Sequence, residues 1–312
     1  MMKAVVNLRN LFRKTVRFGL FIPFSNLIPL YFGKYLPAGF VDYLHNKRNR
    51  IIRKKIQEIS DTKLVTTEPE RPSDPLPIWF FWMQGADNLP CIPRLCLNYA
   101  QKNANGHPVI VVSETNLIEY VQLPDHILQL YQQGRITPTN LSDIIRLGLL
   151  SKYGGLWIDA TLFITRPLPA DLFSLPFFSI KHHPVGHFVS DGQWSSFCIS
   201  AWRNHPLILN AFHILTDYWA HEDIQIDYFF VDCAFDLLYH TDNASRLAID
   251  AVPFTNENIY RLNCLLPLKY DEAQFTELTR DTYLFKLSWK TYTEAELIRD
   301  PDSYYNHLLR QL

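Results

Sequence analysis

The stretch LSDIIRLGLLSKYGGLWIDATLFITRPLP, residues 141–169, combines the signals of a helix, a glycine turn and a strand. Ser142 has a side chain suited to capping a helix, and Asp143 would add negative charge where the helix dipole favours it. The apolar residues that follow point in too many directions for a one-sided helix, which indicates burial on most faces. Gly154 and Gly155 predict the end of the helix, since glycine readily adopts a positive φ.

The run after the glycines, residues 156–164, is rich in residues that favour strands. Alternate side chains of a strand share a face, so Trp157, Asp159 and Thr161 are expected to point the same way. Asp159 is then a carboxylate on an otherwise apolar strand. A lone Asp at such a place is most simply a paired structural residue, but the whole arrangement around it argues for a site.

Strand-like and helix-like segments alternate from residue 78 onward. Residues 78–83 (IWFFWM) and 109–113 (VIVVS) read as buried strands, and helices are expected at 91–102, 116–120 and 127–133. This alternation predicts an α/β fold, in which helices cover both faces of a mostly parallel sheet. Such sheets bind ligands beyond the carboxyl ends of their strands, toward which Trp82 and Asp159 both lie.

The first 60 residues differ in charge from the rest of the chain. They hold twelve Lys or Arg and two acidic residues, a net charge of +10, whereas the remainder carries −11. Residues 1–17 and 41–60 read as basic helices. Between them, residues 18–33 are sixteen uncharged residues, too few for the ~20 of a membrane span and interrupted by prolines.

This N-terminal region, residues 1–65, is therefore expected to be helical. It is either an anchor on an anionic membrane surface or an arm packed on the main domain. Nucleic acid is a poorer partner, because the cations accompany a strongly apolar stretch and no recognised binding motif. A Pro-rich linker is expected at 66–77 and the main domain at 78–312. Five cysteines without a CxxC motif suit a reduced, cytoplasmic setting.

Four segments, in this order, resemble the capsular polysaccharide synthesis proteins: IWFFWMQGADNLP, VIVVS, SDIIRLGLLSKYGGLWIDATLF and FKLSWK. These are bacterial glycosyltransferases related to retaining enzymes that include fungal Golgi mannosyltransferases and glucosylating clostridial toxins. The resemblance covers about residues 76–290, and its most specific part is SDxxR followed by GGxWxDAT. It implies a GT-A fold, a single α/β domain with a nucleotide-binding half.

The resemblance also implies roles for single residues. Trp82 would stack on the uracil of a UDP-sugar, and Gln84 of the same motif would lie in the donor site. Asp143 and Arg146 would contact the sugar and ribose of the donor. Asp159 would help to hold a divalent ion, Mn²⁺ or Mg²⁺, on the diphosphate.

The sequence departs from the wider superfamily at the second carboxylate of the DxD element, where it has Thr161. The hydroxyl of Thr161 can still touch the metal or one of its waters, but it brings no charge. Mg²⁺ and Mn²⁺ prefer anionic oxygen ligands, so the metal dependence of the site is an open question.

Residues 285–290 supply further candidates for the donor site, namely Lys286, Ser288, Trp289 and Lys290. In the related enzymes a C-terminal loop closes over the diphosphate. Fixed cations there would stabilise the negative charge that develops on the leaving diphosphate in the transition state. An ordinary strand with solvated lysines is the alternative interpretation.

The acceptor side is expected around residues 192–232. Asp227 or Asp232 would position an acceptor hydroxyl or activate it as a base, although a helix cap or a salt bridge explains either residue equally well. Trp194 and Ser196 are expected to line this side by the same resemblance. Aromatic residues are also common in a core.

The leading hypothesis is a retaining glycosyltransferase that moves a sugar from a UDP-linked donor onto a capsular or other cell-surface glycan. It would work on the cytoplasmic face of the membrane, where such acceptors are often lipid-linked. The alternative is a non-catalytic nucleotide-sugar-binding subunit of a polysaccharide assembly complex. A glycoside hydrolase would need two carboxylates flanking the sugar bond, and the strand offers one.

Overall fold

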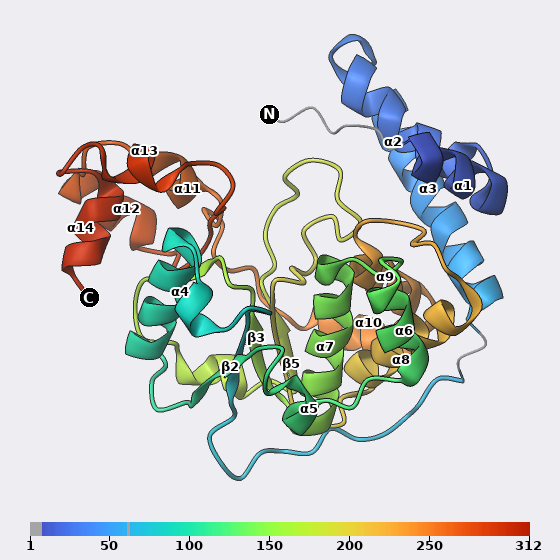
Figure 1. The fold of residues 1–312 in the computed structure, drawn as a ribbon, viewed down its shortest axis with the longest axis horizontal. Coiled ribbons are helices and arrows are strands. Elements are labelled where there is room, and N and C mark those ends of the chain that lie inside the picture. The colour runs from blue at the N-terminus through green and yellow to red at the C-terminus, as the bar shows by residue number, and fades with distance from the viewer. Residues whose placement is uncertain (1–7, 61–62) are drawn as a thin grey trace.

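Five strands form the central sheet of the computed structural model, which describes residues 8–60 and 63–312 (Figure 1). They are β1 (Ile78–Phe81), β2 (Val109–Val112), β3 (Gly155–Ile158), β5 (Phe177–Ser179) and β6 (Cys198–Ala201), in the order β2-β1-β3-β6-β5. β1 pairs in parallel with β2 and β3, whereas β6 runs antiparallel to both β3 and β5. Only β6 opposes the common direction, which confirms the expected mostly parallel sheet.

Helices cover both faces of this sheet. Figure 1 shows α4 (Cys91–Lys102) on one side and α7 (Pro138–Tyr153) with α8 (Pro206–His221) on the other. Ile78, Trp79 and Phe80 of β1 are all buried, as a strand covered on both faces requires. The predicted α/β class is therefore confirmed. The remaining helices of the main body are α5 (Leu117–Tyr120), α6 (Asp125–Gln132), α9 (Phe230–Thr241) and α10 (Asn243–Asp250), with short 3-10 turns η2 (Ala86–Asn88) and η3 (Ala170–Phe173).

Helix α7 begins earlier than the sequence indicates. Thr137 is the N-cap, and its hydroxyl accepts a hydrogen bond from the backbone N–H of Asn140 at 3.2 Å. Pro138 occupies the first turn, where its missing N–H costs nothing. The prediction that Ser142 caps this helix was wrong, because Ser142 lies inside it and donates to the carbonyl of Thr139.

The helix ends where the sequence predicts, at the glycine pair. Gly154 and Gly155 have φ of 69° and 106°. A Cβ at Gly155 would lie 2.3 Å from the carbonyl oxygen of Pro77, so a larger residue there would push β3 away from β1. The sharp turn lets β3 start beside β1 directly after α7.

The strand expected over residues 156–164 is split in two. β3 ends at Ile158, and a turn closed by the hydrogen bond from the N–H of Leu162 to the carbonyl of Asp159, 2.8 Å long, follows. The chain then forms β4 (Leu162–Ile164), which belongs to a separate two-stranded sheet with β7 (Leu284–Lys286). The prediction of one continuous strand was therefore wrong, although Trp157, Asp159 and Thr161 do line the same cavity. Asp159 instead lies in the turn at the carboxyl end of β3.

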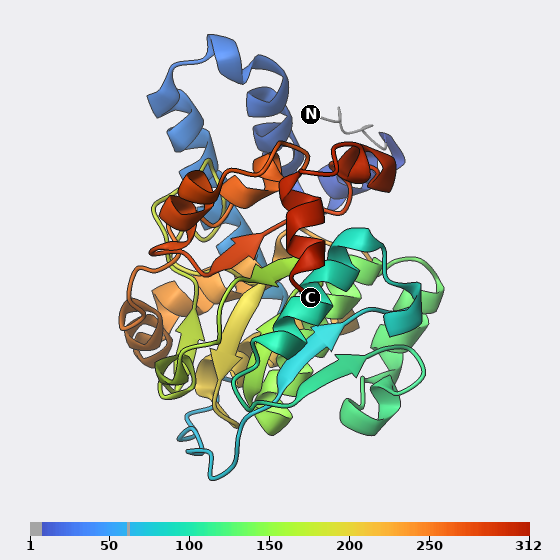
Figure 2. The ribbon, with the colours of Figure 1, turned by 90° about the vertical axis from the view of Figure 1, so that its left-hand side faces the viewer.

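The pair β4 and β7 links the main body to a C-terminal group of helices (Figure 2). Phe163 and Phe285 are cross-strand partners, and both are completely buried in a second core. Tyr99 of α4 joins this core from the central sheet's side, with its ring 4.4 Å from that of Phe163. The C-terminal helices are α11 (Arg261–Leu265), α12 (Glu272–Thr279), α13 (Glu294–Ile298) and α14 (Tyr304–Arg310).

Residues 8–59 form an N-terminal arm of helices, as expected: α1 (Leu8–Phe18), α2 (Phe21–Phe32), the 3-10 turn η1 (Gly33–Tyr35) and α3 (Ala38–Ile59). The second half of α3 packs on the main body, where Ile52 and Ile56 are buried in the large core. The first half carries α2 away from the body (Figures 1 and 2).

Buried and half-buried ion pairs fix the arm to the body. The guanidinium of Arg48 pairs with the carboxylate of Asp227, and both side chains are about 5% exposed. On α1, Arg13 pairs with Asp223 at 2.7 Å, and Arg17 Nε donates to Glu222 at 2.7 Å. Arg13 and Arg17 of α1 therefore face the protein.

No helix within the described residues is both long and apolar enough to cross a membrane. Residues 66–77, the expected linker, contain no helix or strand beyond an isolated bridge between Glu70 and Arg203. The assignment of domain boundaries stays a prediction.

Replacing Arg48 by Met should lower the free energy of unfolding by about 3–5 kcal/mol, because it leaves the carboxylate of Asp227 buried without a partner. Urea denaturation measures the change. The double variant Arg48→Met/Asp227→Leu should recover most of the loss, since it removes both charges. Equal stability of the single and double variants would contradict the assignment.

Candidate active site

A cavity of about 540 Å³ lies beyond the carboxyl ends of β1 and β3. This volume is in the range of small-molecule sites. The cavity joins the end of β1, the first turns of α7, the turn after β3 and the segment after β7. Its lining residues are Phe81, Trp82, Met83, Gln84, Pro138, Thr139, Ser142, Arg146, Trp157, Asp159, Ala160, Thr161, Trp289 and Lys290.

Asp159 accepts bonds from three side chains. Lys286 Nζ lies 2.6 Å from Oδ2, while Arg146 Nη2 and Trp157 Nε1 each lie 3.0 Å from Oδ1. Burial raises the pKa of this carboxyl, but the charges of Lys286 and Arg146 outweigh it and lower the pKa of Asp159 to about 2. Asp159 is therefore ionised at neutral pH and its charge is balanced by two cations.

Arg146 is shared between two carboxyl groups. Besides Asp159, its Nη1 lies 3.1 Å from Oδ1 of Asp143, and its guanidinium stacks 4.9 Å from the centre of the Trp157 ring. Burial raises the pKa of Asp143 to about 7, against the opposing charge of Arg146. The helical spacing of Asp143 and Arg146 thus brings them together, as the sequence predicts.

Two tryptophans approach each other at the cavity. The rings of Trp82 and Trp289 meet edge to face, with centroids 5.9 Å apart. Trp82 Nε1 is buried and has no hydrogen-bond partner among residues 8–60 and 63–312, whereas Trp289 is 42% exposed. Trp79, the other tryptophan of this motif, is in the core and donates to the carbonyl of Gly154. Trp82 and Trp289 are therefore the aromatic faces available to a ligand.

The other donor-side candidates lie close by. Gln84 and Lys290 line the cavity. Ser288 does not; its N–H donates to Asn263 at 2.8 Å, and its hydroxyl accepts from the N–H of Lys290 at 3.3 Å. Ser288 thus holds the shape of the segment that carries Trp289 and Lys290.

The two acceptor-side aspartates have different environments. Asp227 pairs with Arg48 and accepts from the N–H of Phe229, outside the cavity. Asp232, which is also outside the cavity lining, accepts a hydrogen bond from Trp194 Nε1 at 2.9 Å and one from the hydroxyl of Ser196 at 3.3 Å. Burial raises the pKa of Asp232 to about 6. The expected acceptor residues Trp194 and Ser196 therefore gather around Asp232, and Asp227 serves as the arm's ion-pair partner.

Asp159 and Thr161, the expected metal ligands, both line the cavity. However, both carboxylate oxygens of Asp159 already accept from Lys286, Arg146 or Trp157. In the part of the chain that the structure describes, no three His, Cys, Asp or Glu side chains are grouped to hold a metal ion. These residues do not fit a divalent ion held by the protein alone, and the metal role of Asp159 and Thr161 stays a prediction.

The sequence matches the family described as "Capsular polysaccharide synthesis protein" over residues 32–308, most of its length. The chain belongs to this family. The matched range includes α3 of the N-terminal arm as well as the sheet, the cavity and the C-terminal helices.

The chain is also similar to two fungal proteins. It is 26% identical over 161 residues to "O-glycosyltransferase braB" of Annulohypoxylon truncatum, covering 46% of this chain and 37% of that protein. It is 25% identical over 164 residues to "Glycosyltransferase afumC" of Aspergillus fumigatus, covering 44% and 41%. The matches thus span about two fifths of the length of these relatives.

Among solved structures, the chain is similar to one named "PaToxG Glycosyltransferase". The sequence identity is 15%, the TM-score is 0.38, and the match covers 77% of this chain and 99% of that chain. This likeness is too distant to support a conclusion about the site.

Sequence reasoning missed some of the residues that form the site. Trp157 was assigned only to a strand face, yet it donates to Asp159 and stacks on Arg146. Its position two residues before Asp159 was a usable signal. Pro138 and Thr139 line the cavity because α7 begins earlier than predicted, and no motif marked them.

The buried carboxyl of Asp143 should make stability fall as pH rises from about 5 to about 7. Its pKa is about 7 in the folded protein and ~3.9 when unfolded, so between these values only the folded state keeps the proton. For one such group, the free energy of unfolding falls by up to about 1.4 kcal/mol for each unit of pH. Urea denaturation should show a smaller fall over this range for Asp143→Asn than for the wild type. Identical pH dependence of the two proteins would refute the assigned shift.

Proposed function

We propose that this chain is a glycosyltransferase with a GT-A fold that moves a sugar from a UDP-linked donor onto a capsular or other cell-surface polysaccharide. The observation that carries the proposal is the cluster of Lys286, Asp159 and Arg146 beside two tryptophans in a single cavity. Family membership and the names of the two fungal relatives support sugar transfer. Retention of configuration is proposed from the resemblance of the SDxxR and GGxWxDAT motifs to those of retaining enzymes.

The cavity offers separate surfaces for the parts of a nucleotide-sugar. Trp82 presents an aromatic ring for the base, as Trp289 does from the opposite segment. Lys290 lies on the cavity wall, and Lys286 lies behind Asp159. We assign these two cations to the diphosphate, while Asp143 and Arg146 orient the sugar and ribose.

The chemistry requires charge stabilisation at the leaving group. Breaking the bond between the sugar and the phosphate places negative charge on the diphosphate as positive character grows on the sugar. Fixed cations such as Lys286, Arg146 and Lys290 then stabilise the transition state more than the ground state. Asp159 holds two of these cations in place before the donor arrives.

On the acceptor side, the contacts favour Asp232 over Asp227. Asp232 is held by Trp194 and Ser196, and its pKa of about 6 leaves it mostly ionised at neutral pH. An ionised carboxylate can orient an acceptor hydroxyl or take its proton. We propose a glycan, often lipid-linked, as the acceptor, with the protein peripheral on the cytoplasmic face of the membrane.

Asp159→Asn should lower the turnover number at least about 100-fold, because the charged carboxylate that positions Lys286 and Arg146 is removed. The assay incubates the full chain with a panel of UDP-sugars and membrane extract, and mass spectrometry identifies the products. Asp281→Asn, at an exposed carboxylate outside the cavity, is the matched control.

Sugar transfer, measured together with UDP binding, separates the enzyme from a non-catalytic binding subunit, the alternative that the single carboxylate of the motif motivates. Trp82→Ala should weaken UDP binding in either case. Tight UDP binding by the wild type without transfer of any sugar in the panel would replace the proposed reaction with the binding function.

Chelation tests the expected divalent ion. Because Lys286 and Arg146 already balance Asp159, we expect the chain to keep at least half of its activity in excess EDTA. Lys286→Met should remove nearly all activity whether or not Mn²⁺ is added. Complete loss in EDTA with recovery by Mn²⁺ or Mg²⁺ would instead establish the metal role expected for Asp159 and Thr161.

A further inference from the structure

The tip of the N-terminal arm exposes large apolar and aromatic side chains. We call five of them the tip patch: Leu30, Tyr31, Phe32, Tyr35 and Phe40, which are 49%, 47%, 58%, 80% and 43% exposed. They lie on the end of α2, on η1 and on the start of α3. Large apolar side chains gathered at one place on a surface mark a site of interaction.

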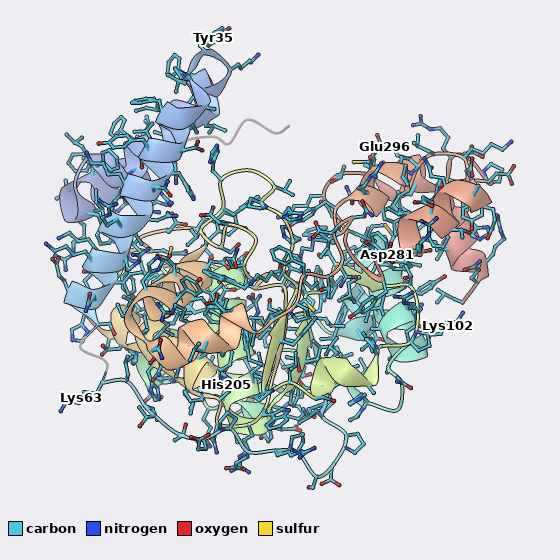
Figure 3. The ribbon with its side chains drawn as sticks, turned by 180° about the vertical axis from the view of Figure 1, so that it is seen from behind. Tyr35, Lys63, Lys102, His205, Asp281 and Glu296 are labelled. Atoms are coloured by element: carbon cyan, nitrogen blue, oxygen red, sulfur yellow. The ribbon has the colours of Figure 1, made fainter. Side chains whose placement is uncertain are left out.

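The arm holds this patch away from the main body. Tyr35 lies at the far end of the arm in Figure 3, and the tip rises from the same side of the molecule as the C-terminal helices in Figures 1 and 2. Contacts between the body and α3 reach the first turns of this helix, where Asp42 lies 3.5 Å from His187 and His45 Nε2 lies 3.1 Å from the carbonyl of Phe188. Residues 30–35 of the tip patch precede these contacts in the chain.

The charge of the arm suits an anionic surface. Lys34 is exposed within the tip, and Asp42, the first acidic residue of the described arm, lies toward His187 of the body at 3.5 Å. Lys47 lies over the rings of Phe21 and Tyr43, 4.8 and 5.4 Å from their centres. Tyrosines flanked by lysines are typical of the headgroup region of a bilayer, where each ring has an apolar body and a polar end.

The apolar side of α1 is the competing surface. Leu8, Phe12 and Val16 form an exposed stripe on this helix. Arg13 and Arg17 of α1 pair with Asp223 and Glu222 of the body, whereas Arg9 is exposed. The two surfaces differ in their aromatic rings, because the tip patch exposes two tyrosines and two phenylalanines beside Lys34, and the stripe on α1 exposes Phe12 alone.

We infer that the tip patch inserts into the headgroup region of an anionic lipid bilayer. This inference names the surface behind the membrane placement proposed above, on which it rests. The contact is interfacial, because the twelve residues of α2 extend about 18 Å against a hydrocarbon core of ~30 Å. Insertion of the tip turns the side of the body that carries the C-terminal helices toward the lipid.

Vesicle flotation with the full chain tests the inference. Wild-type protein should bind vesicles of phosphatidylcholine with about 30% phosphatidylglycerol more strongly than pure phosphatidylcholine, and added salt should weaken the binding. Phe32→Ser/Tyr35→Ser should reduce the partition coefficient at least about tenfold, because it removes two large side chains from the insertion. The matched control is Leu247→Ser/Leu268→Ser, which changes two exposed leucines outside the arm.

Several outcomes would overturn the inference: no vesicle binding by the wild type, equal loss in the control, or loss in Phe12→Ser while the tip variant binds normally. A dimer that only the tip variant dissociates would assign the patch to a second copy. Sugar transfer to a water-soluble acceptor, measured on the same proteins, should be unchanged by the tip variant. Failed vesicle binding with intact transfer would reject only the tip, whereas vesicle binding without transfer would reject only the proposed reaction.

Discussion

The pairing of β4 with β7 brings Lys286 against Asp159 across 127 residues of sequence. Both side chains are partly exposed, so the ion pair itself adds little stability. The apolar residues beside the ion pair stabilise this pairing of strands. Full burial of Phe163 or Phe285 contributes on the order of 1.5–3 kcal/mol each to the folding free energy. The second core thus fixes the register that the site depends on, and the segment with Trp289 and Lys290 follows directly from it.

The carboxyl groups of Asp143 and Asp159 differ in how strongly nearby cations stabilise their ionised forms, and this difference affects the charge of the cavity. Arg146 lies between Asp143 and Asp159, and a single guanidinium cannot neutralise both. Lys286 strengthens the ionisation of Asp159, so Asp143 is the group that retains a proton more easily. With Asp143 neutral and Lys290 on the wall, the cavity carries net positive charge, which suits an anionic diphosphate.

Local patterns gave the fold class and much of the site, and the errors arose where distant segments meet. Asp143 and Arg146 are three residues apart on one helix, so their contact follows from helical geometry. Gly154 and Gly155 predicted the turn that leads from α7 into β3. The end of the strand before Asp159 could not be predicted from the local sequence. β4 leaves the central sheet because it pairs with β7, which lies far along the chain. The ion pair of Asp227 was likewise not predictable in its partner, since Arg48 comes from the arm.

Helix α1 is joined to α2 through Gly19, whose φ of 86° makes a sharp bend between them. Its contacts with the body combine the ion pairs of Arg13 and Arg17 with the burial of Phe18 in the large core. The pair of Arg13 with Asp223 is half-exposed and therefore weak. Higher ionic strength should accordingly loosen the polar side of this helix more than the apolar side that Phe18 holds.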